Sequence, residues 1–451
     1  MVYSSGGPRP ADIQHSEIGQ ENSLIRHLEP KDKALYLTLL ANFSLMGGVV
    51  TLFGAALSKV IETYGWSYTE AGTVYAAASV GFFISSLLTG FLMDHFGSKP
   101  VLVIGLTVEA VSLMFFARTP SVPLNVVLYF LIGLGLGSNE AITNAAVVRI
   151  EERGKSRLMN LMHAFWCVGA IVGPLGVANL IRTRVDWRVV FPVFGVLILI
   201  LTALLLPRQF PKPAFSRNSN SRRSASTSTG SQVAPEVTAP RKRQAGIGGI
   251  LRSGTASFVF LSAFAIFVYI GVEKGVYAWV SVFFVQVIGS SVSLGAAMVA
   301  LYWIGQFLGR LTISVGYHGN RIERVLLLLS VLTVAALLAL AFVHITWIAV
   351  AATFVAGMAN SGVFPLIISL TGKYSTRGRS VGIVTSAGGI AGFLFPVMVA
   401  TISDAKGIAV GFESVFYVSV ALLVVSLIVV ARVRRLDRDD AVATGEEVRI
   451  A

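Results

Sequence analysis

Long apolar runs recur along the chain from Leu35 to Val430, and short polar segments separate them. Each run is roughly 20 residues or longer, enough for a helix to cross a hydrocarbon layer about 30 Å thick. The strands of a membrane β-barrel would instead show short segments of alternating polarity. The pattern therefore predicts an all-α integral membrane protein. Twelve membrane-spanning helices are expected, at about 34–58, 69–93, 100–117, 123–148, 157–181, 188–206, 255–286, 291–314, 323–343, 345–371, 379–402 and 412–432.

A polar segment between the sixth and seventh runs divides these spans into two sets of six. It reads RNSNSRRSASTSTGSQVAPEVTAPRKRQ and has almost nothing to bury, so it is expected to be a disordered linker. The predicted organisation is a disordered N-terminus at 1–32, a six-helix bundle at 33–207, a linker at 208–250, a second six-helix bundle at 251–433 and a tail at 434–451.

The two halves also resemble each other weakly. The second span ends in GFLMDHFGSK and the eighth in GQFLGRLTISVGYHGNR, while the fifth contains GAIVGPLG and the eleventh GGIAGFLFP. Such a repeat with parallel orientation predicts two bundles related by an axis along the membrane normal.

Composition agrees with a membrane protein, since the chain is 54% hydrophobic and only 13% charged, against about 25% charged in a soluble domain. The net charge of +13 lies in loops and tails. No basic face is interleaved with aromatic residues outside the linker, so nucleic-acid binding is excluded.

The basic residues of the loops predict the orientation. An even number of spans places both termini on one side, and the loops of that side carry Lys99, Arg149, Arg153, Lys155, Arg157, Arg321, Arg324, Lys373, Arg377 and Arg379. The loops of the other side carry Lys59, Arg118, Arg182, Arg184 and Lys406. By the positive-inside rule both termini are expected to be cytoplasmic, in a plasma membrane or a bacterial inner membrane.

Several kinds of chemistry are excluded. Cys167 is the single cysteine, so disulfides and cysteine metal sites are not expected. No GxxxxGK[ST] loop is present, so direct coupling to ATP is not expected either. We expect no cleavable signal peptide, no metal and no cofactor.

The stretch GLGLGSNEAITN, residues 133–144, places an acid inside the fourth span. Glu140 lies nine residues before Arg149, about 13 Å along a helix, and a charge at the bilayer centre costs at least about 2.5–3.5 kcal/mol. Gly133, Gly137, Glu140 and Asn144 share one helical face, which predicts a cavity or a packed partner there. Because a carboxyl group removed from water holds its proton more strongly, Glu140 is the candidate proton carrier. The alternative is a protonated side chain that only bonds a neighbouring helix.

The seventh span contains YIGVEKGVYAW, in which Tyr269, Glu273 and Tyr277 recur at intervals of four and share a face. Gly271 and Gly275 permit a local break, of the kind from which transporters build polar sites. Polar side chains in the spans make a candidate solute site, whose members are Asn144, His163, Tyr269, Glu273, Trp279, Gln306 and Asn360.

The alternatives for these candidates stay open. Trp279 offers a flat surface on which a sugar ring can stack, but it also suits the aromatic belt at the membrane interface. His163 is either a packing residue or a binding and relay residue, and Glu109, inside the third span, has no assigned role.

The loop GFLMDHFGSK carries the next motif, in which Gly90 permits a close helix approach, Asp94 can form ion pairs and Gly97 allows a tight turn. With Lys99 it resembles the signature of the major facilitator superfamily, glycine-x-x-x-aspartate-x-x-glycine-x-arginine or lysine. The resemblance implies that this loop is a latch that closes the cytoplasmic side. The alternative is that it is an ordinary short loop.

Within that superfamily the spans resemble the fucose–galactose–glucose proton symporters. The resemblance rests on Glu140, on His163, on the run from Tyr269 to Glu273, and on Asn360, Ser361, Phe364 and Pro365 of GMANSGVFP. It implies sugar transport driven by protons. The first span, LMGGVVTLFGAAL, lacks the acid of the fucose permease pattern, so Glu140 would act alone or the protein would be a uniporter.

These observations predict a secondary active transporter and not an enzyme. Its partners would be a small polar solute, with a sugar favoured, protons and the lipid bilayer, and it would function as a monomer. One alternative is a drug or metabolite exporter, because GAIVGPLG resembles half of the drug–proton antiporter signature. A third is a non-transporting membrane sensor with the same fold.

Overall fold

The computed structural model of the protein describes residues 28–151, 157–210, 254–316, 321–374 and 378–444. The described residues contain twelve helices long and apolar enough to cross a membrane, so the twelve predicted spans are confirmed. Most of the predicted linker and N-terminus lies outside the described residues.

The first half of the chain contributes the first bundle. Its helices are α2 (Pro30–Tyr64), α3 (Tyr68–Phe96), α4 (Ser98–Phe115), α5 (Val122–Ile150), α6 (Arg157–Arg182) and the short 3-10 helix η1 (Trp187–Val189), which runs into α7 (Val190–Leu205).

The second half contributes the second bundle. Its helices are α9 (Gly254–Gln286), α10 (Val292–Gly316), α11 (Ile322–Phe342), α12 (Thr346–Asn360), α13 (Val363–Tyr374), α14 (Gly378–Lys406) and α15 (Ile408–Thr444). The tenth span is thus two helices, α12 and α13, and α15 continues past the end predicted for the last span.

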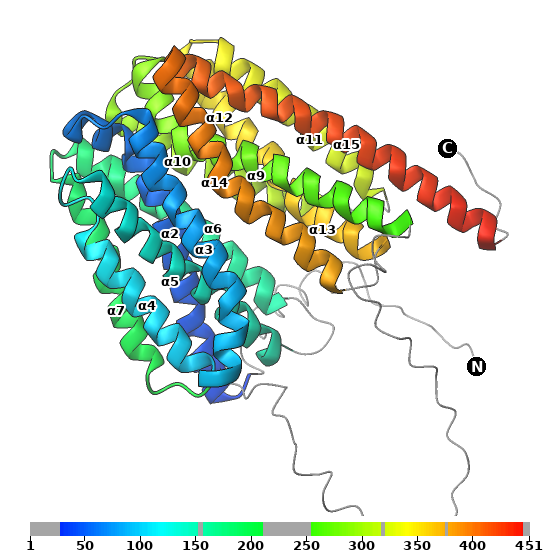
Figure 1. Cartoon of the computed structure of the whole chain (residues 1–451), viewed down its shortest axis with the longest axis horizontal. Helices are drawn as coiled ribbons and strands as arrows, with labels where there is room; N and C mark the ends of the chain where they lie inside the picture. The colour runs from blue at the N-terminus through cyan, green and yellow to red at the C-terminus, as the bar shows by residue number, and fades with distance from the viewer. Residues whose placement is uncertain (1–27, 152–156, 211–253, 317–320, 375–377, 445–451) are drawn as a thin grey trace, which may run out of the picture.

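The two bundles lean together like an inverted V (Figure 1). Helix α3 packs against α14, α6 against α10, and α2 against both α9 and α10. We call the end at which α2 begins and α15 ends the terminal side, and the opposite end the far side. In Figure 1 the bundles converge at the far side, and their long axes diverge toward the terminal side.

Glycines allow the closest helix approaches within the first bundle. A Cβ atom on Gly169 of α6 would lie 1.6 Å from the carbonyl oxygen of Ser44 on α2, and one on Gly133 of α5 would lie 2.1 Å from the carbonyl oxygen of Ala78 on α3. Backbones that approach so closely exclude any side chain, which is the usual role of small residues between membrane helices.

The break predicted in the seventh span is wrong, because α9 is continuous from Gly254 to Gln286. Gly271 instead makes room for the ring of Phe395, and Gly275 for the side chain of Val415. The glycines of this span therefore serve packing within the second bundle, and the interruption lies in the tenth span.

This packing predicts a difference between two glycines of the same helix. In Gly169→Ala the new methyl group must displace the α2 backbone, and such overpacking costs about 1–3 kcal/mol. Gly176→Ala is the matched control, since no atom lies within 4 Å of a Cβ placed there. Thermal unfolding of the purified variants should show a lowered melting temperature for Gly169→Ala alone. Equal melting temperatures for the two variants would contradict the packing described here.

Candidate functional site

Charged and polar side chains gather between the two bundles, away from the helix ends. We call this group the central cluster; its members are Glu140 on α5, His163 on α6, Glu273 and Lys274 on α9, and Gln306 and Arg310 on α10. Direct hydrogen bonds join Glu273, Gln306 and Arg310 in series. Glu140 lies within electrostatic range of Lys274, and His163 within electrostatic range of Arg310, in both cases across the interface.

Glu273 is held by two donors. The Tyr269 hydroxyl, one turn earlier on α9, donates to its Oε1 at 2.7 Å, and the Gln306 amide donates to the same oxygen at 2.7 Å. The Glu273 residue is 9% exposed. The four-residue spacing predicted from the sequence thus brings Tyr269 and Glu273 together, and Gln306 fixes the carboxylate to the neighbouring helix.

Arg310 is a member of the cluster that the sequence reasoning missed. Its guanidinium donates to the Ser361 carbonyl oxygen at 3.3 Å, to Gln306 Oε1 at 3.5 Å and to Cys167 Sγ at 3.6 Å. Cys167 belongs to α6 of the first bundle, so Arg310 reaches across the interface. The available signal was an arginine inside an apolar span, one helical turn after Gln306; the stretch was interpreted instead as a loop repeat.

Glu140 has a charged counterpart in the opposite bundle. Glu140 and Lys274 interact electrostatically, although no direct ion pair joins these two side chains within the described residues. The Lys274 ammonium group also lies 5.3 Å from the centre of the Tyr277 ring. Local spacing does not single out Lys274, because it gives no sign of which residues of different bundles lie near each other.

His163 borders the space between the bundles. Its ring packs edge-on against Phe43, with the centroids 5.1 Å apart, yet the residue is exposed. It also lies within electrostatic range of Arg310 on the other bundle. Because His163 is exposed and lies within electrostatic range of Arg310 on α10, it faces the interface between the bundles.

The other predicted solute ligands lie in different surroundings. Asn144 is partly buried, and its amide oxygen has no hydrogen-bond partner in the described part of the chain. Asn360 donates to the Tyr302 hydroxyl at 2.9 Å and accepts from Thr333 at 3.3 Å, so it is engaged within the second bundle.

Trp279 does not border the cluster in this conformation. It is fully buried, its indole nitrogen donates to the Pro396 carbonyl oxygen at 3.2 Å, and its ring packs against Tyr68 with the centroids 6.1 Å apart. The stacking platform predicted from the sequence is therefore a packing residue between the bundles here, nearer the far side.

Hydrogen bonds between the bundles close the far side. The carboxylate of Asp404, at the end of α14, accepts from the backbone N–H groups of Tyr68 at 2.9 Å and Thr69 at 2.7 Å, at the start of α3. A carboxylate at a helix N-terminus also interacts favourably with the helix dipole. The Tyr68 hydroxyl bonds Gln286. We call this set the far-side gate.

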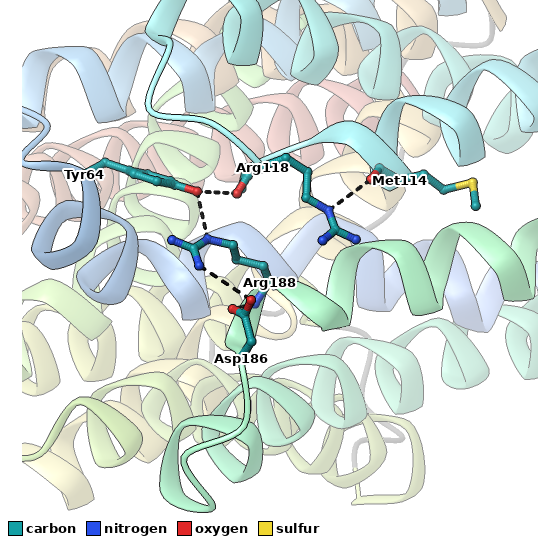
Figure 2. A network of polar contacts seen from close by, with 6 residues as sticks. Tyr64, Met114, Arg118, Asp186 and Arg188 are labelled. Carbon is teal, nitrogen blue, oxygen red and sulfur yellow. Dashed lines mark hydrogen bonds and ion pairs between the residues drawn. The ribbon is translucent and has the colours of Figure 1, made fainter.

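A second network ties together the far-side loops of the first bundle (Figure 2). The Tyr64 hydroxyl donates to the Ala117 carbonyl oxygen at 2.5 Å and accepts from Arg188 at 2.9 Å. Arg188 also pairs with Asp186 at 3.5 Å, and Arg118 donates to the Met114 carbonyl oxygen at 3.4 Å. The end of α2, the segment that follows α4 and the start of η1 are thus fixed to one another on the far side.

The terminal-side loop between α3 and α4 contains the predicted latch residues. Gly97 has a φ of 84°, so the predicted tight turn that requires glycine is present. Lys99 donates to the Leu206 carbonyl oxygen within the first bundle, and Asp94 is exposed. The close helix approach expected at Gly90 is absent, since no atom lies within 4 Å of a Cβ placed there.

Glu109 is a buried acid outside the central cluster. It is 1% exposed on α4, its side chain lies against Gly135 of α5, and neither carboxyl oxygen has a hydrogen-bond partner among the described residues. Burial alone therefore does not distinguish a site residue in this chain, whereas a position between the bundles does.

Comparisons with known proteins agree with this architecture. The family model of the Major Facilitator Superfamily matches residues 38–396 and 311–449. An uncharacterized MFS-type transporter of Bacillus subtilis (strain 168), YfkL, is 24% identical over 380 residues, which cover 82% of this chain and 88% of YfkL.

Two solved structures illustrate the likeness in fold. The nucleoside transporter NupG has a TM-score of 0.65 at 16% identity, with 90% of this chain and 99% of NupG covered. A D-xylose–proton symporter has a TM-score of 0.67 at 14% identity, with 87% of this chain and 96% of the symporter covered. At these identities the likeness establishes the fold alone.

The far-side gate generates a prediction. Asp404→Asn removes the charge at the start of α3 and leaves one oxygen to accept from two N–H groups, so the far side should open more often. Labelling of an engineered Ser281→Cys thiol, in a Cys167→Ser background, reports this opening, because Ser281 is fully buried and bonds Ser58 of the other bundle at 3.0 Å.

We expect a membrane-impermeant maleimide to label this thiol several-fold faster in Asp404→Asn. Glu62→Gln is the matched control, because Glu62 also lies on the far side but, in the part of the chain that the structure describes, pairs only with Lys59 of its own helix. If Asp404→Asn and Glu62→Gln label at the same rate, Asp404 does not hold the gate closed.

Proposed function

The chain belongs to the Major Facilitator Superfamily, and from that premise we propose that it is a proton-coupled symporter of a small polar solute. As a member of this family it is a multi-pass membrane transporter and not an enzyme. The observation that carries the proton-coupling proposal is the place of Glu140, a partly buried acid inside a membrane-spanning helix, within electrostatic range of Lys274 on the other bundle.

The position of this pair supplies a coupling mechanism. A proton on Glu140 removes one of the two charges and hence the attraction between α5 and α9. Since a ligand shifts a conformational equilibrium only through its different affinity for the two states, proton binding must favour the state in which these helices separate. Glu140 therefore does not require an acid on the first span, and the first span contains none.

Alternating access fits the two ends of the molecule. The far-side gate joins α3 to α14, whereas the described latch residues of the terminal side bond only within the first bundle. Rocking of one bundle against the other about the central cluster would break the contacts of the far side and bring the bundles together on the terminal side. With both termini in the cytoplasm, as the loop charges predict, this conformation would be the inward-facing one.

A sugar-like solute suits the neutral hydrogen-bonding groups in and beside the cluster. His163 is exposed, and Asn144, one turn after Glu140 on α5, has an amide oxygen without a partner among the described residues. The resemblance to fucose–galactose–glucose symporters supports the same class. Gly169 and Gly173 of GAIVGPLG, the stretch on which the exporter alternative rests, pack directly against Ser44 and Gly48 of α2, so helix packing is sufficient to account for them.

Proton coupling is strong enough to concentrate such a solute. One elementary charge crossing 100 mV contributes about 2.3 kcal/mol, or roughly fifty-fold in solute concentration.

The coupling role of Glu140 predicts the phenotype of Glu140→Gln. This variant cannot exchange a proton, so we expect loss of solute accumulation driven by a pH gradient, down to the equilibrium level. Exchange of labelled for unlabelled solute should persist, because exchange does not require release of the proton. Both are measured in proteoliposomes with the same preparation of protein.

Glu109→Gln is the matched control, since it neutralises a buried acid of the same bundle away from the interface, and it should accumulate solute normally. Accumulation by Glu140→Gln equal to that of the wild type would refute the proton role. Loss of accumulation in both variants would show that removing either buried acid abolishes transport. A position between the bundles would then not identify the proton carrier.

A further inference from the structure

Arg310 is a partly buried cation whose contacts are all long and all neutral. Its three acceptors, a carbonyl oxygen, an amide oxygen and a sulfur, lie at 3.3, 3.5 and 3.6 Å. Ordinary N–H···O bonds cluster near 2.9–3.0 Å, and bonds from a cation to a carboxylate are shorter still. The guanidinium is therefore held loosely and is not neutralised by direct contact.

The nearest acid does not supply the missing partner. Glu273 interacts with Arg310 electrostatically, but its bound oxygen is already taken by Tyr269 and Gln306. Gln306 stands between the two groups, because it donates to Glu273 and accepts from Arg310. Within the described residues no ion pair of Arg310 is present, and a buried charge is stable only when it is paired or hydrogen-bonded well.

Arg310 lies where the two bundles and the interruption of the tenth span meet. Ser361, whose carbonyl oxygen it bonds, lies at the interruption between α12 and α13, and Cys167 lies on the opposite bundle. His163, one turn before Cys167, is exposed and within electrostatic range. A group bound by Arg310 would thus touch both bundles and the broken span.

We propose that the solute carries a single carboxylate and that Arg310 binds it. The planar guanidinium presents two parallel N–H groups to the two oxygens of a carboxylate. His163, exposed and one turn before Cys167, offers ring nitrogens that can bond hydroxyls, so the substrate class is a hydroxylated monocarboxylate such as a sugar acid. This inference rests on the proposed function and specifies its solute.

The charges of the central cluster fit this class. Glu140 and Glu273 are balanced by Lys274 and Arg310 when His163 is neutral. One proton and one monovalent anion together leave that balance unchanged, whereas a proton with a neutral sugar adds one positive charge between the bundles. Charge uncompensated there is costly, so proton and carboxylate are expected to bind together.

The test compares matched ligands on the purified full-length wild-type protein. The probes are galactose, galacturonate and galacturonamide, with gluconate and lactate as further acids, at constant ionic strength. We expect thermal stabilisation by at least one acid, and about tenfold weaker binding, or none, for galactose and the amide. Equal binding of acid and amide overturns the inference, and so does failure of every acid to bind.

Variants assign the binding to Arg310. Arg310→Gln should lower the affinity for the acid about tenfold or more, and Arg310→Lys should recover part of that affinity. Arg182→Gln is the control, because Arg182 is exposed and, among the described residues, bonds only Asn179 of its own helix. Unchanged acid binding in Arg310→Gln overturns the assignment, and the wild-type ligand comparison stands even if this variant does not fold.

A pH-sensitive dye inside proteoliposomes separates this inference from the proposed function. Proton uptake driven by galactose would support the symporter and overturn the carboxylate inference. An acid that requires Arg310 for binding but moves no proton would support the inference and overturn the coupling. Proton uptake driven by the acid alone, without net charge movement, is the result we expect.

Discussion

The structure depends on the balance of charges that are enclosed between two bundles. Glu140 on α5 lies within electrostatic range of Lys274 on α9, and Gln306 links Glu273 to Arg310 through hydrogen bonds. Neither water nor lipid compensates these charges fully, so each must find its counterpart in the protein. If Glu140 carries the coupled proton, as proposed, the arrangement of the bundles and the protonation of the cluster form one equilibrium, because the first pair crosses the interface.

The rest of the fold makes that equilibrium possible. Glycines such as Gly169 and Gly133 join helices backbone to backbone, so each bundle can move as a unit. The far-side gate, centred on Asp404, uses hydrogen bonds that a small rotation would break. The interruption at Ser361 gives the tenth span a joint beside Arg310. Rigid bundles with polar contacts between them suit alternating access better than a continuous apolar interface would.

Local sequence patterns predicted what depends on local geometry. The lengths of the apolar runs predicted the twelve spans, and the glycine at position 97 predicted the turn there. The four-residue spacing of Tyr269 and Glu273 predicted that these side chains share a face, and they are hydrogen-bonded. The partners Lys274 and Arg310 were missed because the contacts that make them important join helices of different bundles. The break predicted from glycines in α9 was wrong because those glycines accept neighbouring side chains, and packing of this kind is decided by tertiary structure.

The central claim is that Glu140 and Lys274 are coupled across the bundle interface, and a double-mutant cycle measures that coupling directly. Unfolding free energies of Glu140→Gln, Lys274→Gln and the double variant give the interaction energy of the pair. The account predicts that the double variant loses less stability than the two single variants together, by more than the roughly 0.3–0.5 kcal/mol seen for independent sites. Additive losses would contradict it, because the two charges would then not sense each other.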